Sequence, residues 1–454
     1  MKLDGPITHF DHVYDTDENP YFFAHTLDKV YLYNTTTSAF DKDITGSTNF
    51  TGDYDNYWFS TMFKDKYIFT NGVDLVKYYG LTGPIVQNLT GTSLYVPKII
   101  LQFAARILMY NITESGDSIP LRTRWCAAGD EEDWSGSGSG ASDLDGTLNS
   151  SAITTAKRLG DGVIIYGSES MVLQTYRGEY TQPFAFTNII NGLGCPAPRG
   201  VINYGNAHYF IGPDNVYKYS GGRQFDPIGD KIKDELFDLM DPAYVSRSFL
   251  CRTFNDDLLY LFYQSSSSDY PGNFFLYNIS DKTWTKGEIS ATGFGHYLKE
   301  DADTWATVEG TWATITDRWN SRTRESEYPI TLFGDEHGVI HNVSTVVYTQ
   351  YGEKVNSFAD TKTFVRKDGY HREITDWMEF NFRAKGTEVT VQYSTDNGNT
   401  WQEGETYTLT TDWVMYRLDL ETYAETINFR FTGLEYWEID NSSVGFIPST
   451  DRSI

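Results

Sequence analysis

His208-Tyr209-Phe210-Ile211 and Val216-Tyr217-Lys218-Tyr219 are two apolar segments, and the short polar stretch Gly212-Pro213-Asp214-Asn215 separates them. Tyr, Phe, Val and Ile are the residues that strands favour, whereas Gly, Pro, Asp and Asn favour tight turns. Gly221 and Gly222 then end the second segment. The stretch therefore predicts a β-hairpin.

The same unit recurs along the chain. Further copies span residues 21–33, 66–80 and 162–173, with longer versions at 258–277 and 330–343 and a weaker one at 107–125. Turn centres fall near residues 28, 72, 116, 168, 214, 272 and 336, which are about 44 to 64 residues apart. A strand-built repeat of about 40 to 50 residues is typical of a propeller blade. We predict a β-propeller of six or seven blades over residues 1–352, with unrelated hairpins in one or two β-sandwiches as the alternative.

Cleaner alternation of apolar and polar residues begins after the repeat. It is seen in Met378-Glu379-Phe380-Asn381-Phe382-Arg383 and in Ile427-Asn428-Phe429-Arg430-Phe431-Thr432. Such strands have one face on a core and the other in water. We predict that residues 353–454 form a separate, jelly-roll-like β-sandwich, so that the fold class is all-β.

The composition limits the range of functions. The 62 acidic residues outnumber the 36 basic ones, and the net charge of −26 argues against neutralising a phosphate backbone as the main task. At 16% aromatic residues, the chain can bury a large core. Neither a signal-peptide-like start nor a membrane-length apolar run is present, which favours folding in a cytoplasm without membrane insertion.

The sequence contains no specific catalytic signature. It lacks a phosphate-binding loop, a nucleophile elbow and an HExxH pair, and its three cysteines are far apart. His9 with His12, and His337 with His341, are spaced to reach one metal each, but such pairs are more often structural. The acidic turn 53–56 is compatible with weak Ca²⁺ binding. Glycosidases need a pair of carboxylates across the sugar. With 62 acidic residues in the chain, the sequence does not indicate which two would form such a pair. We therefore predict no enzyme, no catalytic residue, no cofactor and no metal site.

One motif match is complete. Residues 394–401, Ser-Thr-Asp-Asn-Gly-Asn-Thr-Trp, match the Asp-box S-x-D-x-G-x-T-W found in sialidases and other propellers. The motif is a turn: we expect Asp396 to hydrogen-bond the hairpin, Gly398 to adopt positive φ and Trp401 to cover the core. It is not catalytic even in sialidases, and here it falls in the predicted sandwich.

Three stretches resemble the β-propeller tail nozzle and tail hub proteins of short-tailed bacteriophages. The first, residues 122–134, is similar to the family pattern R-x-R-W-S-x-x-G-D-x-x-D-W, with Cys126 where the family usually has Ser. The second is the Thr-Trp repeat that ends at Trp319, followed by residues 329–338. The third is the predicted sandwich with its Asp-box and the closing residues 437–452. The residues singled out in the first two are Trp125, Asp133, Trp134, Trp305, Trp312 and Trp319, and we expect packing roles for them.

The resemblance implies a virion protein that is assembled in the host cytoplasm. Several copies, by resemblance a hexamer, would form a homo-oligomeric ring below the portal and the head-to-tail adaptor, in contact with tail fibre, spike or needle proteins. The ring would retain packaged DNA, which passes without sequence-specific binding, and would gate its ejection. A channel wall of like charge repels the duplex, so we expect the acidic residues to concentrate there.

Two alternatives remain open. One is a propeller that binds or cleaves glycans, and the other is a bacterial structural or adhesion protein with the same fold.

Overall fold

The computed structural model describes residues 2–37, 39–46, 49–254, 257–266, 268–297, 329–343, 349–350, 353–354, 356–368, 371–372 and 374–447. The chain divides into two compact units, Met1–Val343 and Ser344–Ile454, whereas the sequence suggested a division after residue 352. Each unit is described by itself. Both are built almost wholly from strands, and none of the helices in the described residues has the length and apolarity needed to cross a bilayer.

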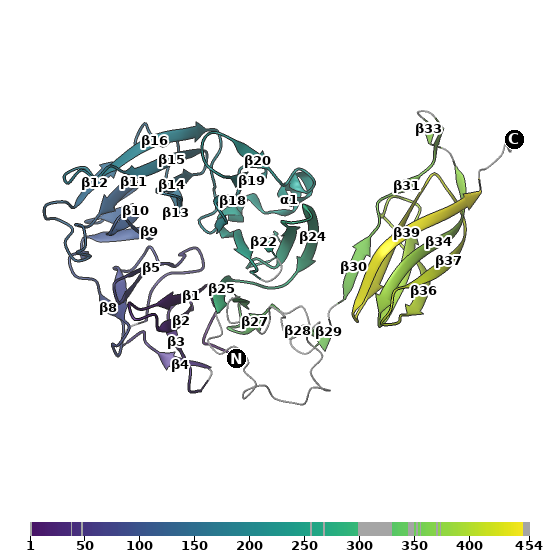
Figure 1. The fold of residues 1–454 in the computed structure, drawn as a ribbon, viewed down its shortest axis with the longest axis horizontal. Coiled ribbons are helices and arrows are strands. Elements are labelled where there is room, and N and C mark those ends of the chain that lie inside the picture. The colour runs from purple at the N-terminus through teal and green to yellow at the C-terminus, as the bar shows by residue number, and fades with distance from the viewer. Residues whose placement is uncertain are drawn as a thin grey trace. The chain divides into compact units, whose positions relative to one another are not determined.

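The first unit is a β-propeller whose described residues form seven antiparallel sheets, six of four strands and one of three. The sheets follow one another around a ring, with the first strand of each near the centre and the last at the rim (Figure 1). We call them the first to the seventh blade. The prediction of a propeller is confirmed, and the blade count is the larger of the two expected.

The first four blades contain β1 (His9–Tyr14), β2 (Pro20–His25), β3 (Val30–Asn34), β4 (Ala39–Asp43); β5 (Phe59–Phe63), β6 (Lys66–Thr70), β7 (Lys77–Gly80), β8 (Gln87–Asn88); β9 (Tyr95–Phe103), β10 (Arg106–Glu114), β11 (Asp117–Trp125), β12 (Gly140–Asp143); and β13 (Ile153–Leu159), β14 (Gly162–Gly167), β15 (Ser170–Tyr176), β16 (Phe184–Asn191). The last three contain β17 (Val201–Tyr204), β18 (Ala207–Ile211), β19 (Val216–Tyr219), β20 (Phe225–Pro227); β21 (Phe249–Arg252), β22 (Leu258–Tyr263), β23 (Asn273–Asn278), β24 (Thr283–Glu288); and β25 (Gly293–Tyr297), β26 (Ile330–Gly334), β27 (Ile340–Asn342).

In most blades the second strand is the most deeply buried. Every residue of β14 and of β18 is buried, which explains why these segments read as unbroken apolar runs. Both faces of a blade pack against neighbouring blades, so alternation is lost there. Seven apolar clusters lie between the seven pairs of adjacent blades, and the cluster between the fifth and sixth also holds Leu236 of helix α1 (Lys233–Leu239), which precedes the 3₁₀ helix η1 (Pro242–Arg247).

The start of the chain closes the ring against the seventh blade. The Leu3 amide donates to the Gly338 carbonyl at 2.8 Å, and the Ile7 amide donates to the Asp335 carbonyl at 3.1 Å. Strand β1 then packs along β25. The closest approach is at Gly295, where a Cβ atom would overlap Phe10 Cβ and crowd the Phe10 backbone. Glycine is therefore required for the two inner strands to meet.

We predict that Gly295→Ala lowers the free energy of unfolding by about 1–3 kcal/mol, because the added methyl group overpacks the closure. Gly80→Ala is the matched control, since its Cβ would meet only a Tyr78 ring atom at 4.0 Å and its φ is not positive. Urea denaturation of both variants measures the difference. Equal unfolding midpoints would contradict a tightly packed closure.

Two histidines, the buried His208 and the half-buried His296, connect neighbouring blades. His208 on β18 accepts a hydrogen bond from the Tyr166 hydroxyl at Nδ1 (2.8 Å) and donates from Nε2 to the Arg158 carbonyl of the preceding blade (2.8 Å). His296 on β25 donates in the same way to the Arg252 carbonyl at 2.7 Å. Burial lowers the pKa of each imidazole to about 4, although the carbonyl contacts oppose it. Both are therefore neutral in the folded protein at neutral pH.

These histidines predict a loss of stability in mild acid. The unfolded chain binds the proton near pH 6.5 and the folded chain only near pH 4, so stability is complete above pH 6.5 and falls as the pH drops toward 4. His208 alone contributes on the order of 2–3 kcal/mol. His208→Gln keeps a donor for the Arg158 carbonyl and should flatten the pH dependence measured by urea unfolding, whereas the exposed control His337→Gln should not. An unchanged slope in His208→Gln would contradict the assignment.

The second unit is a β-sandwich. One sheet has the order β30-β38-β35-β36, with β31 also pairing with β38, and the other has the order β37-β34-β39. Their bounds are β30 (Ser357–Asp360), β31 (Phe364–Val365), β34 (Thr375–Gly386), β35 (Glu388–Ser394), β36 (Gln402–Thr408), β37 (Val414–Ala424), β38 (Thr426–Gly433) and β39 (Trp437–Ile447). Two short hairpins pair β28 (Thr349–Gln350) with β29 (Glu353–Lys354) and β32 (Lys367–Asp368) with β33 (His371–Arg372).

The sandwich core follows from the alternation in the sequence. Phe380 on β34 stacks on Phe429 on β38, and Phe382 on β34 packs edge-on against Phe431 on β38. All four side chains are at most 3% exposed. The two sheets thus share one apolar cluster, and the predicted β-sandwich is confirmed. The finer comparison with a jelly roll stays a prediction.

Candidate functional site at the centre of the propeller

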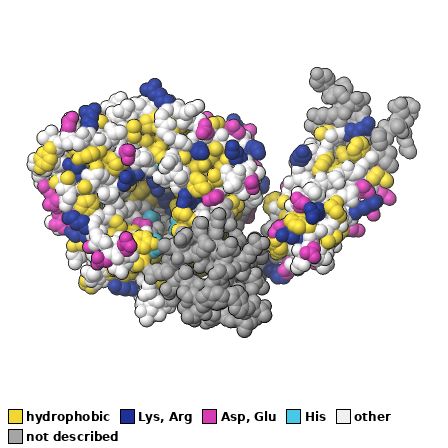
Figure 2. Space-filling view, viewed as in Figure 1, with side chains coloured by type: hydrophobic (Ala, Val, Ile, Leu, Met, Phe, Trp, Pro, Cys, Tyr) yellow, Lys and Arg dark blue, Asp and Glu magenta, His cyan; other side chains and the backbone are white. Residues whose placement is uncertain are grey.

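The innermost strands of the blades carry few acidic residues. Among β1, β5, β9, β13, β17, β21 and β25, the single carboxylate is Asp11, and the basic residues are Lys98, Lys157, Arg158 and Arg252. The acidic residues lie instead on outer strands and in turns, and the face seen in Figure 2 mixes both signs. The prediction that acidic residues concentrate on a channel wall is therefore wrong for the propeller lumen. The physical reason is that a net charge does not determine which strands carry it, and here acidic residues lie on outer sheet edges, where charge opposes pairing with other strands.

A polar cluster joins the inner strands of the first two blades. Ser60 donates to the Asp11 carboxylate at 2.5 Å, and His9 Nε2 lies 3.1 Å from the Ser60 hydroxyl and 3.9 Å from Asp11. Burial raises the pKa of Asp11, but the contacts with His9 and Ser60 outweigh it and the pKa is lowered. In a catalytic triad the carboxylate orients the histidine nitrogen that does not face the nucleophile. Here one nitrogen faces both groups, so the cluster is a structural contact.

The connection between β4 and β5 crosses the entrance to the lumen. Tyr54 from this connection donates to the Thr292 carbonyl at 3.0 Å, in front of the seventh blade, and its ring packs edge-on against Tyr270 at 4.9 Å. These partners lie more than 200 residues away in the sequence. The loop therefore joins the boundary of the first and second blades to the sixth and seventh blades.

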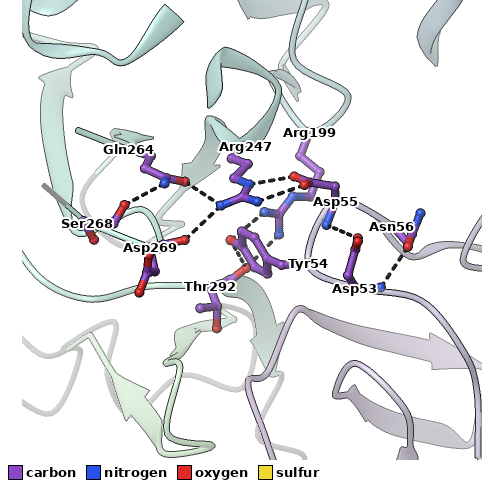
Figure 3. A network of polar contacts seen from close by, with 10 residues as sticks. All are labelled: Asp53, Tyr54, Asp55, Asn56, Arg199, Arg247, Gln264, Ser268, Asp269 and Thr292. Atoms are coloured by element: carbon purple, nitrogen blue, oxygen red, sulfur yellow. Dashed lines mark hydrogen bonds and ion pairs between the residues drawn. The ribbon is translucent and has the colours of Figure 1, made fainter. Parts of the chain in front are cut away.

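Arg199, which precedes the fifth blade, holds the loop in place. Its guanidinium donates to the Thr292 carbonyl (2.8 Å) and to the Tyr54 hydroxyl (2.9 Å) (Figure 3). It also donates to the Thr8 carbonyl at 3.1 Å. It also lies over the ring of Tyr57, 4.7 Å from the centroid. One side chain thus links the fifth blade to the loop and to the segments that precede β1 and β25.

A second arginine fixes the next residue of the loop. Arg247 binds both oxygens of Asp55, at 2.6 and 2.9 Å, and donates to the Gln264 side chain (3.2 Å) and to the Asp269 carbonyl (3.0 Å) (Figure 3). This bidentate contact lowers the pKa of Asp55 and keeps it ionised. Asp53 accepts the Asp55 amide at 2.9 Å. The loop carboxylates that the sequence associated with weak Ca²⁺ binding therefore have protein partners.

A cavity of about 300 Å³ lies beside the loop. Its lining comes from the loop and from the second, third and fourth blades, together with two segments that lead into the fifth and sixth: Asp55, Asn56, Tyr57, Phe59, Asn71, Gly72, Lys98, Ile99, Asn111, Ala152, Ile153, Thr154, Pro198 and Ser246. Asp55 is the single carboxylate among these residues. A glycosidase needs two carboxyl groups across the sugar, and this cavity supplies one that is already bound to arginine.

The structure also locates the predicted motif residues. Trp125 and Trp134, each 2% exposed, pack on opposite sides of the third blade, and Trp134 Nε1 donates to the Glu131 carbonyl at 2.7 Å. Asp133 accepts two backbone amides of the turn that follows it, at 3.2 and 2.6 Å. These contacts give residues 122–134 a packing role in the third blade. The segment is distant in sequence from the lumen loop.

Two further contacts tie this corner to its surroundings. The buried Glu131 forms ion pairs with Lys64 (3.1 Å) and Lys66 (2.7 Å) of the second blade. Cys126 accepts the Ile107 amide at 3.1 Å, so the thiol takes the role of a hydrogen-bond acceptor at the position where the resembling family has Ser. The cysteine is buried and forms no disulfide.

The Asp-box is a hairpin turn between β35 and β36. Asp396 accepts the Thr400 amide (2.9 Å) and hydroxyl (2.6 Å), and these contacts lower its pKa to about 2. Gly398 has φ +89°, and Arg430 lies 4.1 Å above the ring of Trp401. Trp305, Trp312 and Trp319 lie outside the described residues.

The histidine pairs do not assemble a metal site. His341 Nε2 is 3.1 Å from the Asp335 carboxylate, while the His337 side chain is exposed beside Glu336. His9 contacts Ser60, and His12 packs among aromatic rings. Over the described ranges, no three His, Cys, Asp or Glu side chains are placed to hold one ion.

Sequence reasoning did not identify Arg199, Arg247 or Tyr54. Tyr54 lies 145 residues or more from both arginines in the sequence, and no local motif marks any of the three. The turn 53–56 was the one stretch that pointed to this site, because its acidic residues suggested a bound cation. In the structure the positive group at Asp55 is the Arg247 side chain.

The fold and the site together define a seven-bladed propeller with a loop-crossed lumen, followed by a sandwich. No protein-family model and no curated protein matches the chain. Among solved structures, it is similar to the computationally designed protein Ika8 (9% identity, TM-score 0.37), over 75% of this chain and 96% of that one. It is also similar to PorZ, a bacterial surface component of the type-IX secretion system of Porphyromonas gingivalis (10% identity, TM-score 0.38), over 90% of this chain but only 46% of PorZ.

We predict that Arg199→Met lowers the free energy of unfolding by about 2–4 kcal/mol, because several hydrogen bonds to a charged group are lost together. Hydrogen exchange at the Asp55 and Asn56 amides, which donate to Asp53 within the loop, should become faster at the same time. The exposed Arg223 has no polar partner among the described residues, so Arg223→Met is the control. Equal stability of the two variants, with unchanged exchange in the loop, would contradict the role assigned to Arg199.

Proposed function

We propose that the protein is a structural component of a bacteriophage tail, a nozzle or hub that forms a ring, retains packaged DNA and gates its ejection. The observation that carries this proposal is the resemblance of three sequence segments, in the same order, to the nozzle and hub family. The propeller followed by a sandwich is the architecture that the resemblance implies, which supports the proposal without testing it. The role is mechanical, and no residue is assigned to catalysis.

The loop across the lumen entrance limits where DNA could pass in the proposed role. Tyr54, Arg199 and Arg247 join opposite sides of the entrance, so a duplex does not thread a single propeller. In the proposed role the DNA channel is enclosed between copies of the chain. A closed ring needs a head-to-tail interface, in which one patch contacts a different patch on the next copy. We propose a homo-oligomer, by resemblance a hexamer, with the head-to-tail adaptor and tail fibre, spike or needle proteins as partners in the virion.

One end of the sheet β37-β34-β39 offers contact residues for such an interface. Ile374, Tyr423 and Phe446 are 56%, 66% and 45% exposed. Tyr423 pairs with Asp376 and Phe446 with the next residue, Trp377, so these two rings lie at the same end of the sheet but on opposite faces. Exposed aromatic residues are frequent anchors of protein interfaces. We call Ile374, Tyr423 and Phe446 the apolar end of the sandwich.

We predict that the purified chain, mixed with its cognate head-to-tail adaptor, forms rings visible by electron microscopy and multiples of 51.7 kDa by mass measurement. Tyr423→Glu should reduce ring formation at least tenfold, because it places a charge in the apolar end. Thr408→Glu adds the same charge on an exposed position of the other sheet and should leave assembly unchanged. Monomers alone under all these conditions would overturn the proposal.

The cavity favours a second candidate, a glycan-binding propeller. Its size is at the lower end of small-molecule sites, and its lining mixes amides, hydroxyls and apolar side chains. Cleavage is not favoured there, because Asp55 is the one carboxylate in the lining. Specific binding on a glycan array, together with failure to form rings, would promote this candidate over the nozzle.

A further inference from the structure

The outer strands of the blades differ in how they are protected against pairing with another chain. An outer strand has a free edge, and natural sheets protect such edges with charged residues, with proline or by keeping the strand short. Strands β4, β12, β20 and β24 each carry at least one carboxylate, and β8 is two residues long. Strand β16 has none of these features. It spans eight residues, Phe-Ala-Phe-Thr-Asn-Ile-Ile-Asn, without a charge or a proline.

Strand β16 is also accessible. It lies at the rim of the fourth blade (Figure 1), and among the described residues its one strand partner is β15. Thr187 and Asn191 on this strand are exposed. Two aromatic side chains are exposed at the end where the strand begins: Tyr176, which pairs with Phe184, is 48% exposed, and Tyr180 in the preceding loop is 62% exposed. The fourth blade therefore presents an unprotected edge with aromatic residues at one end.

The sandwich has one edge of the same kind. The edge strands β30, β36 and β37 carry charges along their length, including Asp360, Glu403 and Asp419. Strand β39 differs, because the seven residues after Asp440, Asn-Ser-Ser-Val-Gly-Phe-Ile, are uncharged. In the described part of the chain it pairs with β34 alone. This run includes Phe446 of the apolar end of the sandwich, so the unprotected edge is continuous with that surface.

The opposite sheet leaves β39 uncovered along part of this edge. A groove of about 290 Å³ separates β39 from β30 and is lined by Ala359, Asp360, Thr361, Phe431, Ile439, Asp440, Asn441 and Ser442. Arg430 binds both oxygens of Asp360, at 2.6 Å each. Arg383 donates to Asp440 at 2.9 Å. Both carboxylates of the groove are thus paired with arginine, and another uncharged strand can approach β39 without burying an unpaired charge.

We propose that β16 of one copy pairs with β39 of the next copy, so that the sheet of the fourth blade continues into the sheet β37-β34-β39 of its neighbour. This contact rests on the proposed ring and names its interface. A head-to-tail ring needs two different patches on each chain. Among the described outer strands and sandwich edges, β16 and β39 are the two with long uncharged runs.

The free edges also define the kind of occupant. Their backbone N–H and C=O groups require an extended strand as a partner, as in other cases of strand addition. In a chain with a net charge of −26, pairing between two of the acidic edges would bring like charges together. Pairing of β16 with β39 avoids this repulsion, which favours a second copy as the partner.

The two strands run antiparallel across this contact. Antiparallel pairs are slightly more stable than parallel pairs. This direction also brings the aromatic ends together, with Tyr176 near Phe446, whereas the parallel direction would place Tyr176 near Asp440. Thr187 and Ser443 in the middle of the two strands then lie beside each other. Both are exposed, and neither hydroxyl has a hydrogen-bond partner within the described ranges.

Cross-linking of the full chain tests the pairing directly. With Thr187→Cys and Ser443→Cys in one chain, under the ring-forming conditions with the cognate adaptor, a short bis-maleimide should give covalent multimers in steps of 51.7 kDa on a denaturing gel. Each single-cysteine variant should give none, because the three native cysteines are buried. Rings without covalent multimers would overturn the pairing and leave the ring proposal intact. Dimers from Thr187→Cys alone, or cross-links within one monomer, would overturn the pairing as well.

Charge placement gives an independent test. Thr187→Lys and Ser443→Glu each add a charge to an edge that has none at that point, so each should reduce ring formation about tenfold. The two changes in one chain create an opposite-charge pair across the strands and should restore ring formation to within about threefold of the original level. Thr285→Lys, at an exposed position of β24, is the matched control and should leave assembly unchanged. Single variants that assemble normally, or a double variant without rescue, would overturn the pairing.

Failure of the ring and failure of the pairing are distinguishable. Open chains of copies that cross-link between Thr187→Cys and Ser443→Cys would support the pairing and contradict the closed ring. Monomers alone under all conditions would overturn both.

Discussion

Closure of the ring is the constraint on which the propeller depends. Each of the seven apolar clusters belongs to two adjacent blades, so no blade has a core of its own. An open chain of blades would expose one apolar face at each end. The cluster that removes this exposure contains Leu3, Ile7 and Phe10 from the start of the chain and residues of the seventh blade. The stability of every blade therefore depends on a contact between segments more than 280 residues apart.

The same closure creates the lumen entrance. Thr8 and Thr292 precede β1 and β25, and they lie close together because the ring closes between these strands. Their carbonyls would face the lumen without sufficient partners if Arg199 did not reach them from the fifth blade. Once Arg199 is fixed, it orients Tyr54 and Tyr57 of the loop. The cavity lies on the other side of this loop, so its shape is a consequence of how the ring is closed and pinned.

Much of the fold could be predicted from the sequence because its causes are local. A buried second strand such as β18 is a short apolar run bounded by Gly and Pro, and the alternation in β34 shows which side chains enter the sandwich core. The number of blades was uncertain because the seventh blade has short strands, and in the described residues its fourth position is represented only by the bridge between Lys2 and Val339.

The site was not predictable from the sequence. Arg199 and Tyr54 have meaning only after the ring closes, and an arginine that satisfies backbone carbonyls leaves no pattern in its own neighbourhood. The lumen charge was predicted wrongly because a net charge gives no information about which strand carries it.

The placement of the acidic residues has a physical reason that is independent of DNA. The fourth strand of a blade is a free sheet edge, and unpaired edges invite association with other strands. Charged side chains on those edges oppose it, and Asp41, Asp43, Asp143, Asp226 and Glu288 lie on β4, β12, β20 and β24. The inner strands need no such protection and carry a surplus of basic residues.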